Sequence, residues 1–185
     1  MPPSAPLFIF RNPPVNTALA TRKMLSFCKK EDMIYIFNEI LNHSKNKEDV
    51  NEAIFLFNNK KYKSCILILF SLIDGIIINS QKKRKNKKGK VVYRDFGKKG
   101  LEKFIEENKI NCNEEKLFFF IQMYSSLQTC LEKIFENGFD FRRQPSGINR
   151  NFVAHGMLRR NVIRKDCVQV FLLYYNLMTF IERYR

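Results

Sequence analysis

The sequence predicts an all-α protein, folded as an up-and-down bundle of helices. No stretch of it alternates apolar and polar residues as a half-buried strand would. All six prolines lie at positions 2, 3, 6, 13, 14 and 145, so the chain from Val15 to Gln144 lacks this helix breaker. Near the end, apolar residues recur every three or four positions, as on one face of a helix: Val168, Phe171, Leu172, Tyr175 and Met178.

The length of the chain indicates a single domain. With 185 residues it can bury one ordinary core, but it is short for two. The proline-interrupted stretch 1–16 is expected to form an irregular arm, and residues 17–185 are expected to form one helical domain without internal repeats.

The first half of this domain is expected to contain four helices. We place them at 17–29, at 31–43, from the N-cap Asn46 onward, and at 61–79. The fourth is the most apolar and should lie at the centre. Its apolar run, residues 65–79, is shorter than the roughly 20 residues that cross a bilayer and is interrupted by Asp74 and Gly75, which predicts a buried helix and no membrane partner.

A basic loop is expected over residues 80–96. Its segment QKKRKNKKGK (81–90) carries seven Lys or Arg residues, whose mutual repulsion would oppose a helix.

The second half is expected to hold four more helical segments. The first spans 98–108, and the second runs from an Asn111–Glu114 capping box to about 137, where Gly138 ends it. After a loop at 139–147, a short helical segment at 148–156 is closed by Gly156. Asp166 and Gln169 are expected to cap the final helix.

The charge of the chain favours a polyanionic partner. There are 33 Lys and Arg residues against 18 Asp and Glu, which gives a net charge of +15. Nucleic acid is the first candidate, followed by an acidic protein or membrane surface, although a basic surface can also lack any such partner.

Cysteine usage and the N-terminus indicate a reducing, cytoplasmic location. The five cysteines are scattered and form no C-x-x-C pair, and with two histidines they do not match the spacing of a zinc site. The N-terminus lacks the basic region and uninterrupted apolar core of a signal peptide. We therefore expect no metal and no cofactor.

The segment INRNFVAHG (148–156) holds the candidate catalytic residues Arg150, Asn151 and His155. On a helix, Asn151 and His155 share a face, and the long side chain of Arg150 can reach the same cleft. These residues suit RNA cleavage by the 2′-hydroxyl: His155 would move a proton, Arg150 would stabilise the charged phosphoryl group, and Asn151 would hold either partner in place. The alternative is a helix end, where the dipole accounts for a histidine before glycine.

One histidine is too few for a reaction that uses both a base and an acid. A symmetric homodimer would place two copies of the segment across one groove. The other histidine, His43, is expected to be an exposed or capping residue at a helix end.

The stretch RNFVAHG resembles the signature of the HEPN family, an arginine followed by a polar residue and then a histidine after four to six positions. Residues 58–79 resemble the earlier core helix of HEPN-like proteins of the Arg-Asn-x-x-x-His-Gly type, which makes Asp74 a candidate partner of the motif. The resemblance covers about residues 50–185. It implies a dimeric, metal-independent endoribonuclease of a toxin–antitoxin or antiviral system, with Arg150 and His155 catalytic and Asn151 in support.

Two alternatives stay open. Many HEPN domains have lost catalysis and bind RNA or a protein partner, such as an antitoxin or a component of a defence complex. A basic helical nucleic-acid-binding protein without a family link is the third possibility. Met157 stands where one toxin branch has a tyrosine, so inactivation by modification of that tyrosine is not expected.

Basic residues on the loop and around the motif are candidates for contact with the RNA backbone. They are Lys82, Lys83, Arg84, Lys85, Lys87 and Lys88 on the loop, and Arg142, Arg143, Arg159, Arg160 and Arg164 beside the motif. Phe139 and Phe141 would either stack on bases or pack in the core. The stretch LFFFIQMY (117–124) is expected in the core or a dimer interface.

Overall fold

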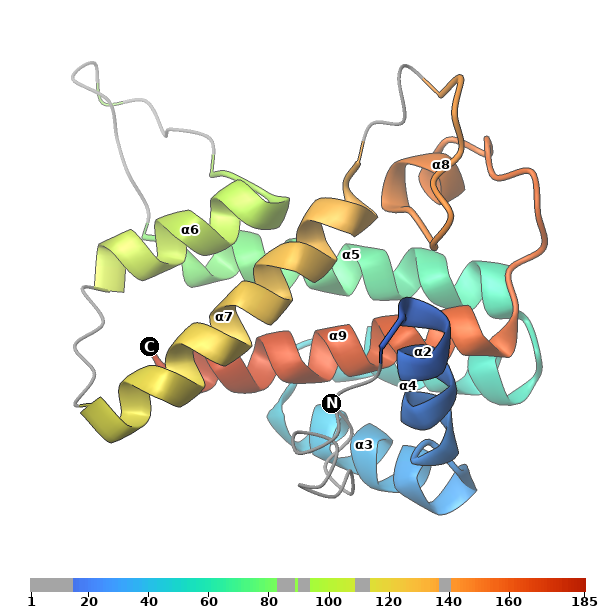
Figure 1. The fold of residues 1–185 in the computed structure, drawn as a ribbon, viewed down its shortest axis with the longest axis horizontal. Helices are drawn as coiled ribbons and strands as arrows, with labels where there is room; N and C mark the ends of the chain where they lie inside the picture. Colours follow the sequence, from blue (N-terminus) through green and yellow to red (C-terminus); the bar gives the residue numbers. More distant parts are fainter. Residues whose placement is uncertain (1–14, 83–88, 90–93, 109–113, 137–140) are drawn as a thin grey trace.

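In the part of the chain that the structure describes, every regular element is a helix, so the predicted fold class is confirmed (Figure 1). The computed structural model describes residues 15–82, 89, 94–108, 114–136 and 141–185. The helices are α2 (Thr17–Ser26), α3 (Lys30–His43), α4 (Lys47–Asn58), α5 (Tyr62–Ser80), α6 (Gly97–Asn108), α7 (Glu114–Ile134), α8 (Arg150–Ala154) and α9 (Arg164–Arg183).

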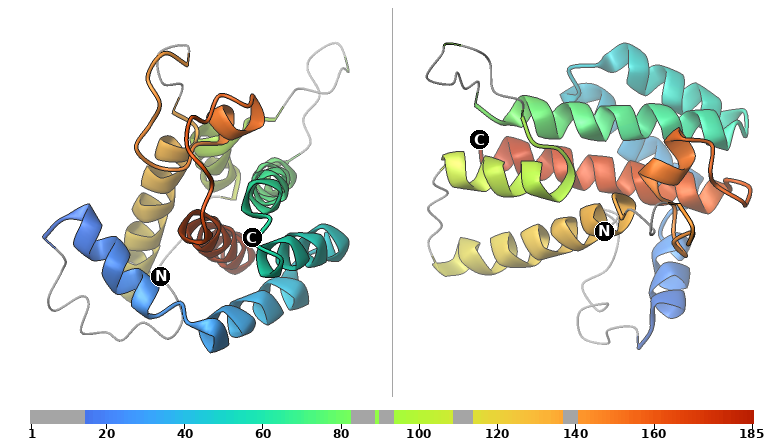
Figure 2. Two further views of the ribbon diagram at one scale, coloured as in Figure 1. Left: turned by 90° about the vertical axis from the view of Figure 1, so that its right-hand side faces the viewer. Right: turned by 90° about the horizontal axis from the view of Figure 1, so that it is seen from above.

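Helix α9 forms the centre of the bundle. Viewed end on, it lies between α7 on one side and α5 on the other, with α3 and α4 below (Figure 2). Its apolar residues are buried on several sides, including Val168, Phe171, Leu177 and Phe180, none of which is exposed to solvent. The three-to-four spacing recognised in the sequence therefore marks the most enclosed helix of the fold.

Helix α5 is the second core helix and runs in the same direction as α9 (Figures 1 and 2). Among the described residues it is the one helix long and apolar enough, by length and composition, to cross a membrane, with a mean hydropathy of 1.7. Here it packs between α4, α6 and α9. Its residues Cys65, Ile66, Leu69, Ile73 and Ile77 are fully buried in the core.

Close packing of α6 on α5 depends on a glycine. A Cβ atom at Gly100 would lie 2.3 Å from Cγ2 of Ile77 and 2.6 Å from the carbonyl oxygen of Asp95. Only glycine allows this approach.

Aromatic rings join the first helices to the core. The ring of Phe37 on α3 lies 5.6 Å from that of Phe57 on α4, and both contact Phe171 on α9 at 4.8 and 5.6 Å. Edge-to-face arrangements of this kind add to the energy of burial.

Several predicted helix ends differ from those observed. Helix α2 ends at Ser26 rather than 29. Asn46 is the N-cap of α4, yet its side chain makes no cap hydrogen bond. Asp166 is the third residue of α9, not its cap, and its carboxylate accepts a hydrogen bond from the backbone N–H of Ile163 at 2.9 Å. Asn111 and Gly138 lie outside the described residues.

The stretch 117–124 on α7 is only partly in the core. Phe120, Met123 and Tyr124 pack against it. The side chains of Leu117, Phe118, Phe119 and Ile121 are between 43% and 66% exposed. Of the two predicted positions for the stretch, the core is therefore wrong for these four, and the dimer interface stays a prediction.

Candidate functional site

Helix α8, which carries the candidate catalytic residues, is anchored by Asn149. This residue is fully buried, and its Oδ1 accepts a hydrogen bond from the N–H of Phe152 as an N-cap. Its Nδ2 donates to the carbonyl oxygens of Lys133 and Glu136 at 3.2 and 2.8 Å. One amide thus caps α8 and ties it to the end of α7. This role of Asn149 was not predicted from the sequence, although an asparagine directly before a helical segment is a recognisable cap signal.

The other end of α8 is closed by a Schellman motif. The N–H of Met157 donates to the carbonyl of Phe152 at 2.8 Å, and that of Gly156 donates to the carbonyl of Val153 at 3.2 Å. Gly156 has φ of +69°, a value that side chains disfavour. The predicted closure by Gly156 is confirmed, and it places His155 at the C-cap.

Arg150 is paired with Asp74. The Nη2 atom of Arg150 donates to Oδ2 of Asp74 at 3.1 Å, and the two side chains are 34% and 18% exposed. Oδ1 of Asp74 is buried and has no hydrogen-bond partner among the described residues. Within the apolar helix α5, the carboxylate of Asp74 therefore binds a partner on α8 through Oδ2. Its Oδ1 is an acceptor without a partner among the described residues.

Asn151 lies beside this pair and faces the end of α7. Its Nδ2 donates to the carbonyl oxygen of Phe135 at 3.3 Å, and its Oδ1 lies 3.5 Å from Nη1 of Arg150. Asn151 therefore extends the hydrogen-bonded group from α5 through α8 to α7.

His155 is exposed, and its imidazole makes no hydrogen bond to any residue that the structure describes. The ring of Phe141 meets it edge to face, with ring centroids 5.3 Å apart. Phe141 also packs on Phe152 at 5.1 Å, so of its two predicted uses the structure places it in packing. Phe139 lies outside the described residues.

The structure thus brings Arg150, Asn151 and Asp74 together and leaves His155 on the same short helix without a hydrogen bond to them. Two N–H groups of Arg150 are engaged with Asp74 and Asn151. A guanidinium has five, so the others can donate to an anion.

Two of the predicted RNA-binding arginines have partners within the fold. Arg160 forms a two-pronged ion pair with Asp166, at 2.7 and 2.8 Å, and Asp166 is buried. This hydrogen bonding raises the pKa of Arg160. Arg164 donates to the carbonyl of Cys28 and lies over the ring of Phe57. Arg142, Arg143 and Arg159 are exposed.

Most of the basic loop falls outside the described residues, namely Lys83, Arg84, Lys85, Lys87 and Lys88. Lys82 is described and binds the end of α6. Its backbone N–H donates to a carboxylate oxygen of Glu107, and its Nζ donates to the carbonyl of the same residue at 2.8 Å.

A basic groove lies between the turn from α4 to α5 and the connection from α8 to α9. It has a volume of about 390 Å³. The basic residues that line it are Lys60, Lys61, Lys63, Arg159 and Arg160. The three lysines were not among the residues predicted to bind RNA. The segment KKYK (60–63) was a detectable signal, but only the fold brings it beside Arg159.

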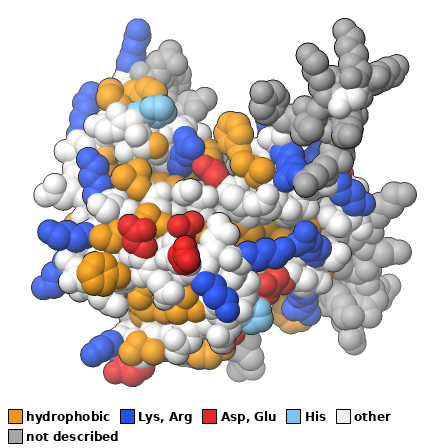
Figure 3. Space-filling model, turned by 180° about the vertical axis from the view of Figure 1, so that it is seen from behind, with side chains coloured by type: hydrophobic (Ala, Val, Ile, Leu, Met, Phe, Trp, Pro, Cys, Tyr) orange, Lys and Arg blue, Asp and Glu red, His pale blue; other side chains and the backbone are white. Residues whose placement is uncertain are grey.

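Positive charge is also present on the back of the molecule. On the face opposite to that of Figure 1, Lys and Arg side chains surround several apolar areas and do not form one continuous patch (Figure 3).

His43 ends α3 and is half exposed, as expected, and its Nδ1 pairs with Oε2 of Glu182 at 3.1 Å. The described ranges contain no group of three or more His, Cys, Asp or Glu side chains placed to hold a metal ion.

Comparisons of the chain with protein-family models, with curated proteins and with solved structures gave no match.

Proposed function

We propose that this protein is an endoribonuclease of the HEPN type that needs no metal and acts as a homodimer in toxin–antitoxin or antiviral defence. The observation that carries the proposal is that Arg150 of α8 pairs with Asp74 of α5, at a helix whose C-cap is the exposed His155. This pairing is the one that the resemblance to the HEPN signature implies for Asp74.

The proposed reaction is attack of an RNA 2′-hydroxyl on the neighbouring phosphate. His155 takes the proton of the hydroxyl or returns one to the departing 5′-oxygen. The N–H groups of Arg150 that Asp74 and Asn151 leave unused donate to the phosphoryl oxygens, where negative charge grows. Asp74 fixes the guanidinium from behind and so acts as a positioning residue.

The second proton-transfer group would come from the partner subunit's copy of α8. Such an interface has to run along the exposed residues of the α8 end, His155, Gly156 and Met157. The exposed apolar residues of α7, which begin at Leu117, lie at the end of α7 remote from α8 (Figure 1). That surface alone would leave the two catalytic segments apart.

The basic groove supports RNA as the substrate. It borders the connection that leaves α8 and displays Lys60, Lys61, Lys63 and Arg159. An RNA strand that passes the end of α8 would place its neighbouring phosphates in this groove. The affinity from such backbone contacts falls steeply as the salt concentration rises.

A non-catalytic HEPN module that binds RNA or a protein partner is the second candidate. The observation that favours it is that Arg150 is engaged within its own chain, while no hydrogen bond from a described residue orients the imidazole of His155.

One experiment separates the two candidates. The purified protein is incubated in EDTA with an RNA oligonucleotide and with the same oligonucleotide carrying 2′-deoxy sugars, and binding and cleavage are both measured. The enzyme cuts only the RNA, and Arg150→Ala abolishes cutting, while Arg22→Ala, which removes an exposed arginine of α2 away from the groove, retains it. Binding without cleavage of either strand refutes the enzyme and supports the module.

A further inference from the structure

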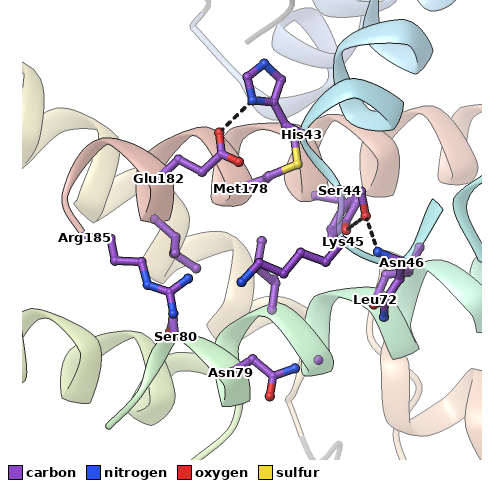
Figure 4. Close-up of a pocket in the computed structure, with 14 residues that line it drawn as sticks. His43, Ser44, Lys45, Asn46, Leu72, Asn79, Ser80, Met178, Glu182 and Arg185 are labelled. Carbon is purple, nitrogen blue, oxygen red and sulfur yellow. Dashed lines mark hydrogen bonds and ion pairs between the residues drawn. The ribbon is translucent and has the colours of Figure 1, made fainter.

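A cavity of mixed polar and apolar lining lies apart from α8, between the connection of α3 to α4, the second half of α5 and the end of α9 (Figure 4). It encloses about 100 Å³. Leu72, Ile76, Met178 and Ile181 give it an apolar floor, and polar side chains surround its opening. None of Arg150, Asn151 and His155 lines it.

Two cationic side chains reach over this cavity from opposite sides. Lys45 extends from the α3–α4 connection, and Arg185 extends from the segment that follows α9 (Figure 4). Neither forms an ion pair with a described carboxylate. Two cations that converge on one cavity attract an anion.

The carboxylate at the rim is already engaged. Glu182 is the acidic residue that lines the cavity, and its Oε2 pairs with Nδ1 of His43 at 3.1 Å. The charged side chains that line the cavity are therefore two cations and one carboxylate, and that carboxylate already has a partner in His43.

Asparagine amides add neutral donors. Asn79 lines the cavity, and its Oδ1 accepts a hydrogen bond from Arg94 at 3.4 Å, which leaves its Nδ2 to donate. Asn46 lines the opposite side.

Gly75 is among the residues that line the cavity. A Cβ atom at this position would meet no atom within 4 Å, in contrast to Gly100, where glycine is required by packing. A larger side chain at position 75 would therefore extend into open space beside the cavity.

We infer that this cavity binds a phosphate group, either as free phosphate or as the phosphate of a small monoester whose organic part extends to solvent. A phosphate dianion matches the two cations, and its three outer oxygens accept from Lys45, Arg185 and Asn79 together. A carboxylate has two oxygens and one charge and would leave donors unused. The inference does not depend on the proposed ribonuclease activity.

Isothermal titration calorimetry at fixed ionic strength tests it, with inorganic phosphate and adenosine 5′-monophosphate as probes. The wild type binds at least one probe saturably at one site, and the stronger probe tells whether free phosphate or the ester is preferred. The double variant Lys45→Ala/Arg185→Ala loses roughly tenfold or more in affinity.

Two further variants test whether binding depends on the cavity or only on the positive charge of the protein surface. Lys30→Ala/Lys47→Ala removes the same charge from exposed positions that do not line the cavity, and it binds as the wild type does. Gly75→Leu fills the cavity and abolishes binding, and it is scored only if its helical circular dichroism is retained. Absence of saturable binding, equal affinity in the Lys45→Ala/Arg185→Ala variant, or equal losses in both double variants would overturn the inference. Undiminished binding by folded Gly75→Leu would do so as well.

Discussion

The carboxylate of Asp74 on α5 accepts a hydrogen bond at 3.1 Å from the guanidinium of Arg150 on α8, two residues that lie 76 positions apart in the chain. The pair joins the core helix α5 to the short helix α8.

Removal of Arg150 is expected to cost more stability than removal of Asp74. Arg150→Ala leaves a largely buried carboxylate without its partner, whereas Asp74→Ala leaves an arginine that water can reach. We expect a loss of about 1–2 kcal/mol in the free energy of unfolding for Arg150→Ala, and a coupling of about 1 kcal/mol in the double-mutant cycle. Urea unfolding measures both. Strictly additive effects would show that the two side chains do not interact.

Two glycines with equally open surroundings are expected to respond in opposite directions to alanine. Neither Gly156 nor Gly75 has an atom within 4 Å of the Cβ position, but only Gly156 has a positive φ. Gly156→Ala is expected to destabilise the fold by about 1 kcal/mol because it strains the Schellman motif. Gly75→Ala should stabilise it by about 0.5–1 kcal/mol. Thermal unfolding checks the pair, and shifts of the same sign would contradict this account.

The neighbouring arginines 159 and 160 are expected to separate stability from RNA binding. Arg160→Ala leaves the buried Asp166 without its two-pronged partner and should cost about 2 kcal/mol. Arg159→Ala should change stability by less than about 0.5 kcal/mol. It should weaken RNA binding and reduce the slope of log affinity against log salt by about one. Fluorescence anisotropy over a salt series measures the slope. If Arg159→Ala lowered stability and left the slope unchanged, the role of the basic groove in RNA binding would be refuted.

The sequence was sufficient to predict the helical bundle, but not the contacts that each arginine makes in it. Helix α5 and the final helix were predictable because their apolar patterns are strong and local. The partner of Arg160 was not, since only the turn before α9 brings it back onto Asp166. For the same reason the lysines of the basic groove, which lie about 100 positions before Arg159, could not be joined to it by local pattern.

The candidate site was predictable in its residues and not in its contacts. Spacing placed Arg150, Asn151 and His155 on one helical segment, and an acidic residue inside an apolar helix had to find a partner. Spacing also suggested that Asn151 could support His155. In the structure the side chain of Asn151 instead bonds the carbonyl of Phe135, because α8 is short and lies against the end of α7.

Alkaline pH is expected to destabilise the fold through Tyr174, which is buried in the core with its hydroxyl oxygen 3.1 Å from that of Ser44. Burial raises the pKa of Tyr174. The folded state therefore keeps the proton of this tyrosine at a pH where the unfolded chain, with a tyrosine pKa of about 10, has begun to lose it.

The stability that Tyr174 contributes is thus complete below about pH 10 and is lost as the pH rises above it. Tyr174→Phe should cost about 1 kcal/mol at pH 7. The difference between wild type and variant should shrink between about pH 9 and pH 11 in denaturant titrations, because phenylalanine has no proton to lose. A difference that stays constant over this range would exclude the effect.

The most direct test of the proposed function is the single-turnover rate of RNA cleavage by His155→Ala compared with the wild type, with protein in excess and EDTA present. The exposed imidazole makes no hydrogen bond to another described residue, so its removal should leave the fold and RNA binding intact. We expect cleavage to fall by about a hundredfold or more, the usual contribution of a general acid or base. Cleavage by His155→Ala at the wild-type rate would contradict the proposed function.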